Sequence, residues 1–115
     1  MNIDGRSKNG FSIIDIAGKI NKLKDSSSLK LFIRKLQDEK KSHIALNLKE
    51  VTYLDSGALN ALIFCHNALS RSEGKLVLIA PNQYVNDVLS VVGLDKIVTI
   101  YPSEEEFEHD TSTSA

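Results

Sequence analysis

Apolar residues along the chain follow two alternating patterns, short continuous runs and longer stretches with helical spacing. The short runs are rich in β-branched and aliphatic residues, which is typical of buried strands, and they occupy 11–17, 43–48, 75–80 and 97–101. The longer stretches repeat apolar residues at intervals of three and four, which is typical of one buried helical face. The clearest such stripe comprises Leu29, Phe32, Ile33 and Leu36.

Local signals mark the ends of the predicted helices. Ser26–Ser28 offers capping hydroxyls ahead of the first helical stripe, and Asp55-Ser56 opens a second helix that extends to about Ser72. A third helix ends at Gly93, and an acidic helix is expected over 104–109. Strands and helices therefore alternate along the chain.

This alternation predicts a single α/β domain. Strands that are joined through helices form a largely parallel sheet, because each helix carries the chain back to the end of the sheet at which the previous strand began. We expect a central, mostly parallel sheet of four to five strands covered by about four helices, the fifth strand being a short one near Ile3. The domain is expected to span 1–109, and 110–115 to form a flexible C-terminal tail because it has no apolar residue before its final alanine.

Composition narrows the class of protein. The 14 basic and 15 acidic side chains leave a formal net charge of −1, so no bulk field would attract nucleic acid or an anionic membrane. No apolar run approaches the roughly 20 residues of a membrane-spanning helix, and the N-terminus lacks the apolar core of a signal peptide. The single cysteine, Cys65, excludes an internal disulfide and suits a reducing compartment. We expect a cytoplasmic protein, monomeric because no long exposed apolar stripe is evident.

Catalytic chemistry is not indicated. The histidines, His43, His66 and His109, are scattered and form no metal-ligating cluster with the cysteine. A hydrolase pairing of Ser56 with His66 fails because the residues between them span about 15 Å along one helix, beyond hydrogen-bond reach. The glycines are isolated and form no phosphate cradle. We therefore expect no catalytic residues and no bound metal.

Ser56 stands at the junction of a loop and a helix, where the first backbone N–H groups lack intrahelical partners. On local sequence alone the favoured interpretation is a helix N-cap formed by Asp55 or Ser56, worth about 1 kcal/mol. The same position leaves a hydroxyl exposed beside two small residues, Gly57 and Ala58, where another protein's active site can reach it. Phosphorylation would add about −1.5 to −2 charges, which a helix N-terminus tolerates but a closely packed partner would not.

Three segments give the chain a family resemblance. The densest is HIALNLKEVTYLDSGALNAL over 43–62, with a buried strand, an Asp-Ser pair and a helix rich in small residues and leucine. The other two are GKLVLIAPNQYVNDVLSVVGLDKIVTIYPSEEEF over 74–107 and IAGKINKLKDSSSLKLFIRKL over 16–36. Together the three segments resemble the STAS domain, specifically the single-domain anti-sigma factor antagonists.

The resemblance implies a function without catalysis and without a cofactor. Such proteins bind an anti-sigma factor that is also a serine kinase with an ATP-binding fold, and they thereby free a sigma factor. The kinase phosphorylates the serine after the aspartate, which is Ser56 here, and a PP2C-type phosphatase restores the active form. The implied partner-binding residues surround Ser56 and are Tyr53, Leu54, Asp55, Gly57, Ala58 and Asn60, with Gly18, Asn21 and Lys22 as a flanking edge.

Two stretches differ from the family pattern. After Asp-Ser the family commonly carries a small residue and then Gly-Leu-Gly, whereas here Asn60 adds a side chain to this face. In the turn after the first strand, Lys19 and Asn21 replace two acidic residues, so a phosphate is easier to hold and a different kinase can be accepted. Two alternatives therefore stay open. One is a single-domain STAS adaptor that controls secretion, biofilm formation or motility, and the other is a module that binds a small ligand such as a nucleotide or lipid.

Overall fold

The computed structural model describes residues 1–112 of the 115-residue chain, and these residues form one five-stranded sheet. Its strands lie in chain order, as β1 (Asn2–Lys8), β2 (Phe11–Ile20), β3 (His43–Leu54), β4 (Lys75–Ile79) and β5 (Thr99–Tyr101). β1 pairs with β2 in antiparallel orientation, and the other neighbouring pairs are parallel. The predicted α/β class with a mostly parallel sheet is confirmed.

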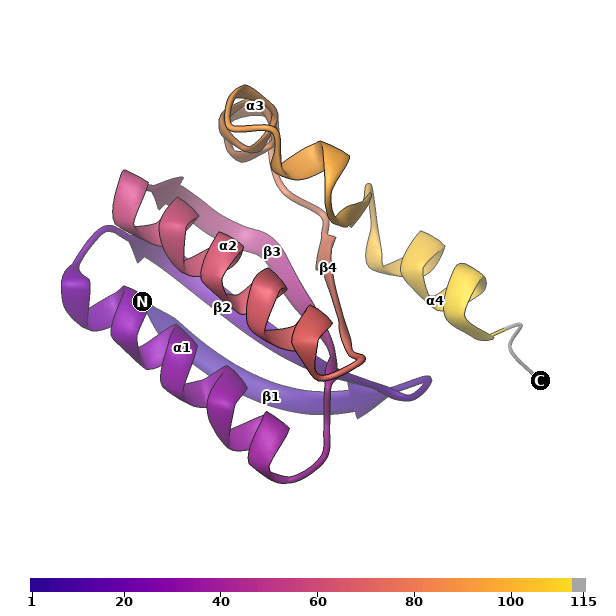
Figure 1. Cartoon of the computed structure of the whole chain (residues 1–115). Coiled ribbons are helices and arrows are strands. Elements are labelled where there is room, and N and C mark those ends of the chain that lie inside the picture. The colour runs from indigo at the N-terminus through magenta and orange to yellow at the C-terminus, as the bar shows by residue number, and fades with distance from the viewer. Residues whose placement is uncertain (113–115) are drawn as a thin grey trace.

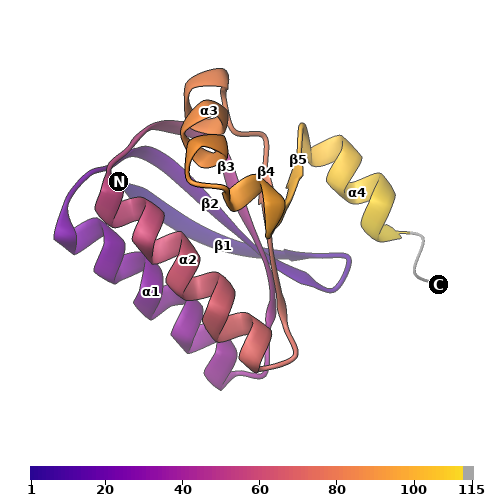
Figure 2. The same cartoon turned by 45° about the horizontal axis from the view of Figure 1, so that its top comes forward.

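Within these described residues, four α-helices cover the two faces of the sheet, namely α1 (Leu23–Asp38), α2 (Ser56–Arg71), α3 (Gln83–Val91) and α4 (Glu104–Ser112). α1 and α2 lie side by side across one face (Figure 1). A short helical turn, η1 (Leu94–Lys96), follows α3 and leads into β5. α4 packs on the opposite face through Phe107 and lies away from the other helices (Figure 2).

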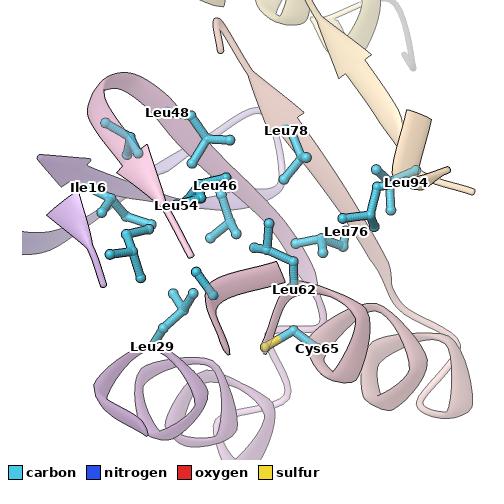
Figure 3. Packing of buried hydrophobic residues seen from close by; sticks show 14 of the residues in the cluster. Ile16, Leu29, Leu46, Leu48, Leu54, Leu62, Cys65, Leu76, Leu78 and Leu94 are labelled. Carbon is cyan, nitrogen blue, oxygen red and sulfur yellow. The ribbon is translucent and has the colours of Figure 1, made fainter. Parts of the chain in front are cut away.

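Strand alternation divides the core between the two faces. The face toward α1 and α2 carries direct neighbours from three adjacent strands, which are Ile14, Leu46 and Leu78. Leu29 of α1 and Leu62 of α2 belong to the same buried cluster (Figure 3). The other face carries the preceding residue of each strand, Ile13, Ala45 and Val77. Phe107 of α4 is completely buried in this second cluster.

β1 is a full edge strand rather than a short strand near Ile3. It pairs with β2 along its length through a two-residue turn, in which Asn9 and Gly10 have φ angles of 52° and 83°. An Asn-Gly pair suits this turn because both residues adopt the left-handed backbone conformation at little cost. Most of β1 is exposed, so hydrophobic alternation gave little sign of the strand's length.

The two central strands run further than predicted. The expected ends lay before Gly18 and at Leu48, whereas the strands continue to Ile20 and Leu54. Gly18 has a φ of +95° and lies beside an irregularity of the register between Gly18 and Lys19. Because glycine adopts this conformation without a steric penalty, pairing of the strands resumes beyond it.

The first helix begins at Leu23, before the serines that were expected to cap it. Lys22 occupies the N-cap position, and its carbonyl accepts from the backbone N–H of Ser26 at 3.2 Å. Ser26 is therefore a buried residue inside the helix, and the predicted capping by Ser26–Ser28 is wrong. The helix starts early because the turn that follows β2 needs only two residues after Ile20.

The C-terminal elements are also displaced from their predicted bounds. β5 starts at Thr99 rather than at 97, and α4 continues to Ser112, beyond its expected end at 109. Residues 110–112 of the expected tail are therefore helical, while 113–115 lie outside the described residues. No helix in the described part of the chain is long and apolar enough to cross a membrane.

Candidate functional site

Ser56 is the first residue of α2. This helix begins at the end of the sheet where β2 and β3 finish (Figure 1). The backbone amide of Asp55 donates to the carbonyl of Ile20 at 3.1 Å, which ties the end of β3 to the end of β2. Ser56 itself is exposed to solvent. The fold thus presents this residue on the surface, at a point that two strands hold in place.

Asp55, and not Ser56, caps the helix. Asp55 Oδ1 accepts from the backbone N–H of Ala58 at 2.8 Å, and Asp55 has the extended backbone of an N-cap residue. This bond satisfies one of the amide donors that a helix N-terminus leaves unpaired. The Ser56 hydroxyl makes no hydrogen bond within residues 1–112. The sequence left open whether Asp55 or Ser56 caps the helix. In the structure Asp55 is the cap, and the Ser56 hydroxyl is left exposed.

Gly57 brings the first turn of α2 close to the capping carboxylate and to α1. A Cβ at this position would lie 3.3 Å from Asp55 Oδ1 and 3.7 Å from Ser26 Oγ. The N-terminal turns of the two helices are therefore adjacent. A larger side chain at 57 would press on the group that caps α2.

The residues that the resemblance implied as a flanking edge lie at the end of β2 and in the turn between β2 and α1. Lys19 pairs with Tyr53 in the register of the two strands, and the exposed Asn21 and Lys22 follow shortly after. Gly18, which lies before the register shift, is half-buried. Neither lysine forms an ion pair with any other residue of the described chain. Two free positive charges therefore border the Ser56 surface.

Burial divides the residues that were expected to bind a partner. The exposed ones are Tyr53, Gly57, Asn60, Asn21 and Lys22, and Asp55 is half-buried. Leu54 and Ala58 belong to the core instead, with exposed fractions of 3% and 0%. Leu54 ends the buried face of β3, and Ala58 lies on the inner face of α2. These two residues hold the surface in position from below rather than forming part of it.

One neighbouring residue, Tyr84, was not predicted. Its ring stacks on that of Tyr53, with the ring centroids 6.0 Å apart and an interplanar angle of 12°. Asn82 anchors this turn, because its Oδ1 accepts from Val85 N at 2.8 Å and its Nδ2 donates to Val51 O at 3.1 Å. The two rings meet only because α3 packs against β3, and no local pattern in the sequence reports that contact.

Other groups that could carry chemistry lie away from this surface. Within residues 1–112, no three His, Cys, Asp or Glu side chains are grouped so that they could hold a metal ion. Cys65 is buried in α2, and desolvation raises the pKa of its thiol to about 11. The thiol is therefore protonated at neutral pH in the folded domain, which makes it unreactive.

The sequence matches the STAS domain family over residues 2–107. The chain belongs to this family. A Thermotoga maritima protein named as a candidate anti-sigma factor antagonist is 38% identical to this STAS domain over 63 residues. The match covers 55% of this chain and 56% of the relative, so it spans about half the length of each protein.

Solved structures share the fold of this STAS domain. The crystal structure of a candidate anti-sigma factor antagonist from T. maritima has a TM-score of 0.82 at 23% identity, covering 96% of this chain and 94% of that one. The anti-sigma factor antagonist SpoIIAA in its unphosphorylated form has a TM-score of 0.77 at 14% identity, covering 99% and 100%. Its phosphorylated form has a TM-score of 0.73 at 14% identity, covering 94% and 98%. At these identities the likeness shows the fold alone.

Proposed function

We propose that this STAS domain is a cytoplasmic, non-enzymatic anti-sigma factor antagonist that acts by partner switching. It binds an anti-sigma factor that is also a serine kinase with an ATP-binding fold, and phosphorylation of Ser56 releases it. The observation that carries the proposal is the exposed Ser56 hydroxyl, which is free of hydrogen bonds within residues 1–112 while Asp55 caps the helix beside it.

Two relatives support the proposal. The T. maritima relative is named as a candidate anti-sigma factor antagonist. It is 38% identical to this chain over the 63 matched residues. SpoIIAA has been solved in unphosphorylated and phosphorylated forms, and both resemble this chain in fold. A domain of this architecture therefore keeps its fold when it carries a phosphate, which a reversible switch requires.

The geometry around Ser56 explains how a phosphate would break a complex without unfolding the domain. Ser56 lies in the first turn of α2, where the helix dipole and unpaired N–H groups stabilise an anion. A phosphate there adds about −1.5 to −2 charges beside the carboxylate of Asp55. A partner packed on this surface would have to desolvate both anions, which costs several kcal/mol for each ion that is left unpaired.

Exposure of the same hydroxyl also suits the reverse step. A PP2C-type phosphatase, which carries its own divalent metal, would reach a phosphate on Ser56 from solvent. The STAS domain is the substrate in both directions, and it needs no cofactor of its own for either step.

Phosphosite mapping tests the proposal directly. The protein is incubated with ATP and the purified anti-sigma kinases of its source organism, and the product is mapped by mass spectrometry. We expect one phosphate on Ser56 and none on the Ser56→Ala variant. Ser27→Ala removes an exposed serine from the neighbouring helix and serves as the matched control, which should be modified like the wild type. A phosphate at another residue, or at none, would refute the assignment.

In a second candidate function, phosphorylation of Ser56 still switches partner binding, but the process that it controls is not the release of a sigma factor. Lys19 and Asn21 stand where the family usually has acidic residues, and the free charge of Lys19 favours a kinase with an acidic docking surface. The protein would then be a STAS adaptor that controls secretion, biofilm formation or motility. Phosphorylation rates measured with the anti-sigma kinases and with other serine kinases of the same organism distinguish the two outputs.

A further inference from the structure

Tyr84 lies outside the surface that was predicted around Ser56, yet it stacks on Tyr53, which belongs to that surface. We propose that Tyr53, Tyr84 and Lys19 form a second recognition patch, on which the kinase that modifies Ser56 docks, and that Tyr84 helps to determine which kinase is accepted. The inference rests on the proposed function and adds to it a docking surface on α3. The kinase that fits presents an apolar patch rimmed by carboxylates.

The stability of the isolated domain does not account for the two rings. Tyr53 and Tyr84 are 41% and 43% exposed, whereas the ring of Phe107 is completely buried. Neither tyrosine hydroxyl makes a hydrogen bond within residues 1–112. An aromatic ring with a polar tip is the kind of side chain that is enriched in protein interfaces, where a partner buries its faces. The pair therefore has the composition of a binding surface.

The patch is held in place before a partner arrives. Asn82 caps α3 with its Oδ1 and bonds the carbonyl of Val51 with its Nδ2, so the turn that carries Tyr84 is attached to the strand that carries Tyr53. The nearly parallel stack further limits the rotation of each ring. A surface that is already ordered loses little conformational entropy on binding, and residues of this kind contribute most of the binding energy in interfaces.

The patch adjoins the segment of chain that leads to the phosphoacceptor. Tyr53 precedes Ser56 by three residues, and Lys19 is the direct neighbour of Tyr53 across the strand pair. The charges of Lys19 and Lys22 are unpaired within the described chain, so carboxylates on the partner would complement them. One partner surface can therefore contact the serine, the lysines and the rings together.

This arrangement assigns switching and selection to different residues. The phosphate acts at Ser56, whereas the rings make the same contacts before and during phosphoryl transfer. Loss of an interaction that is equal in the ground state and the transition state raises KM and leaves kcat unchanged. Removal of the Tyr84 ring should therefore affect KM alone.

Titration calorimetry with the purified anti-sigma kinases of the source organism, together with phosphorylation kinetics, tests the inference. Tyr84→Ala should weaken binding at least about tenfold, as expected for an interface anchor, and should raise KM while kcat stays within about twofold. Tyr84→Phe keeps the ring and should bind within about threefold of the wild type. Val91→Ala is the matched control, because it trims a side chain that is 86% exposed at the other end of α3, and it should bind normally.

The outcomes separate this inference from the proposed function. If Tyr84→Ala binds like the wild type while Ser56→Asp binds weakly, the docking patch is refuted and the switch stands. If Ser56→Asp binds as tightly as the wild type, or no kinase binds, the proposed function and the inference fall together. Because Tyr84 is exposed, Tm of its variants should stay within about 3 °C of the wild type. Weaker binding that merely follows a lower Tm would overturn the inference.

Discussion

Arg6 in β1 holds Glu104 in α4 by two hydrogen bonds, from Nη1 to Oε2 at 2.8 Å and from Nη2 to Oε1 at 2.7 Å. The same guanidinium donates through Nε to Asp15 Oδ2 in β2 at 2.7 Å. One side chain therefore joins the first strand, the second strand and the last helix. A bidentate pair of this kind is stronger than a single surface ion pair.

The Arg6 pairs predict a stability that falls in acid. Hydrogen bonding from Arg6 lowers the pKa of both Glu104 and Asp15. A carboxyl group with a lowered folded pKa contributes stability that is fully present above its unfolded pKa of about 4, and that is lost as the pH falls through the folded pKa. Tm should therefore drop below about pH 4 in a thermal unfolding series, and the drop should be smaller in Arg6→Gln.

At neutral pH the same variant should lose little stability. The side chains of Arg6 and Glu104 are 38% and 30% exposed, so solvent screens their attraction and Arg6→Gln should cost about 1 kcal/mol. If Arg6→Gln shows the acid dependence of the wild type, the groups responsible for it lie elsewhere.

The assignment of the cap to Asp55 predicts unequal effects from two adjacent substitutions. Asp55→Ala removes the acceptor for Ala58 N and should lower the free energy of unfolding by about 1 kcal/mol. Ser56→Ala removes a hydroxyl without a hydrogen bond in the described chain and should change it by less than about 0.5 kcal/mol. Urea unfolding measures both values. Equal losses of unfolding free energy in the two variants would show that Ser56 also contributes to capping α2.

A negative charge at position 56 should imitate the released state. Ser56→Ala should bind the kinase like the wild type, whereas Ser56→Asp and Ser56→Glu should bind at least about tenfold more weakly, because the partner must desolvate a second anion beside Asp55. Ser27→Asp places the same charge at an exposed position of α1 and should leave the affinity unchanged. Equal affinities for all three Ser56 variants would show that this residue lies outside the interface.

Two glycines predict different costs for the same substitution. A Cβ at Gly74 would lie 2.2 Å from the backbone oxygen of Ser42, so the chain would have to move. Gly93 has a φ of +78° and no atom within 4 Å of its would-be Cβ, so only backbone strain opposes a side chain. Gly93→Ala should cost about 1 kcal/mol and Gly74→Ala about 3 kcal/mol or more in chemical unfolding. Similar costs would mean that the approach of Ser42 is easily relieved.

The parts of the fold that were predictable are those in which local pattern and burial agree. Leu29 and Ile33 repeat at helical spacing and are buried as that spacing requires, and the apolar runs around Leu46 and Leu78 form central strands. β1 is different, because backbone pairing and an Asn-Gly turn define it while most of its residues are exposed to water. A hydrophobic pattern cannot report such an edge strand in full.

The candidate site was predictable to a similar extent. The position of Ser56 at a helix start follows from its neighbours, but the choice between two capping residues depends on atomic geometry. Tyr84 reaches the site through the packing of α3, and the last helix extends to Ser112 with partners that are distant in sequence. One of these is Asn9, whose Nδ2 donates to the backbone carbonyl of Glu108 at 3.2 Å. Contacts of this kind form only in the assembled fold, and no local sequence pattern indicates them.

Cys65 gives the chain a reporter of its own opening motions. It is the single thiol, it is 1% exposed, and it lies in the cluster that α1 and α2 share. A thiol reagent can modify it only when these helices separate transiently, so the labelling rate measures how often this local opening occurs. Since the same two helices begin at the Ser56 surface, kinase docking should slow the labelling, and partner occupancy can be followed without attaching a probe.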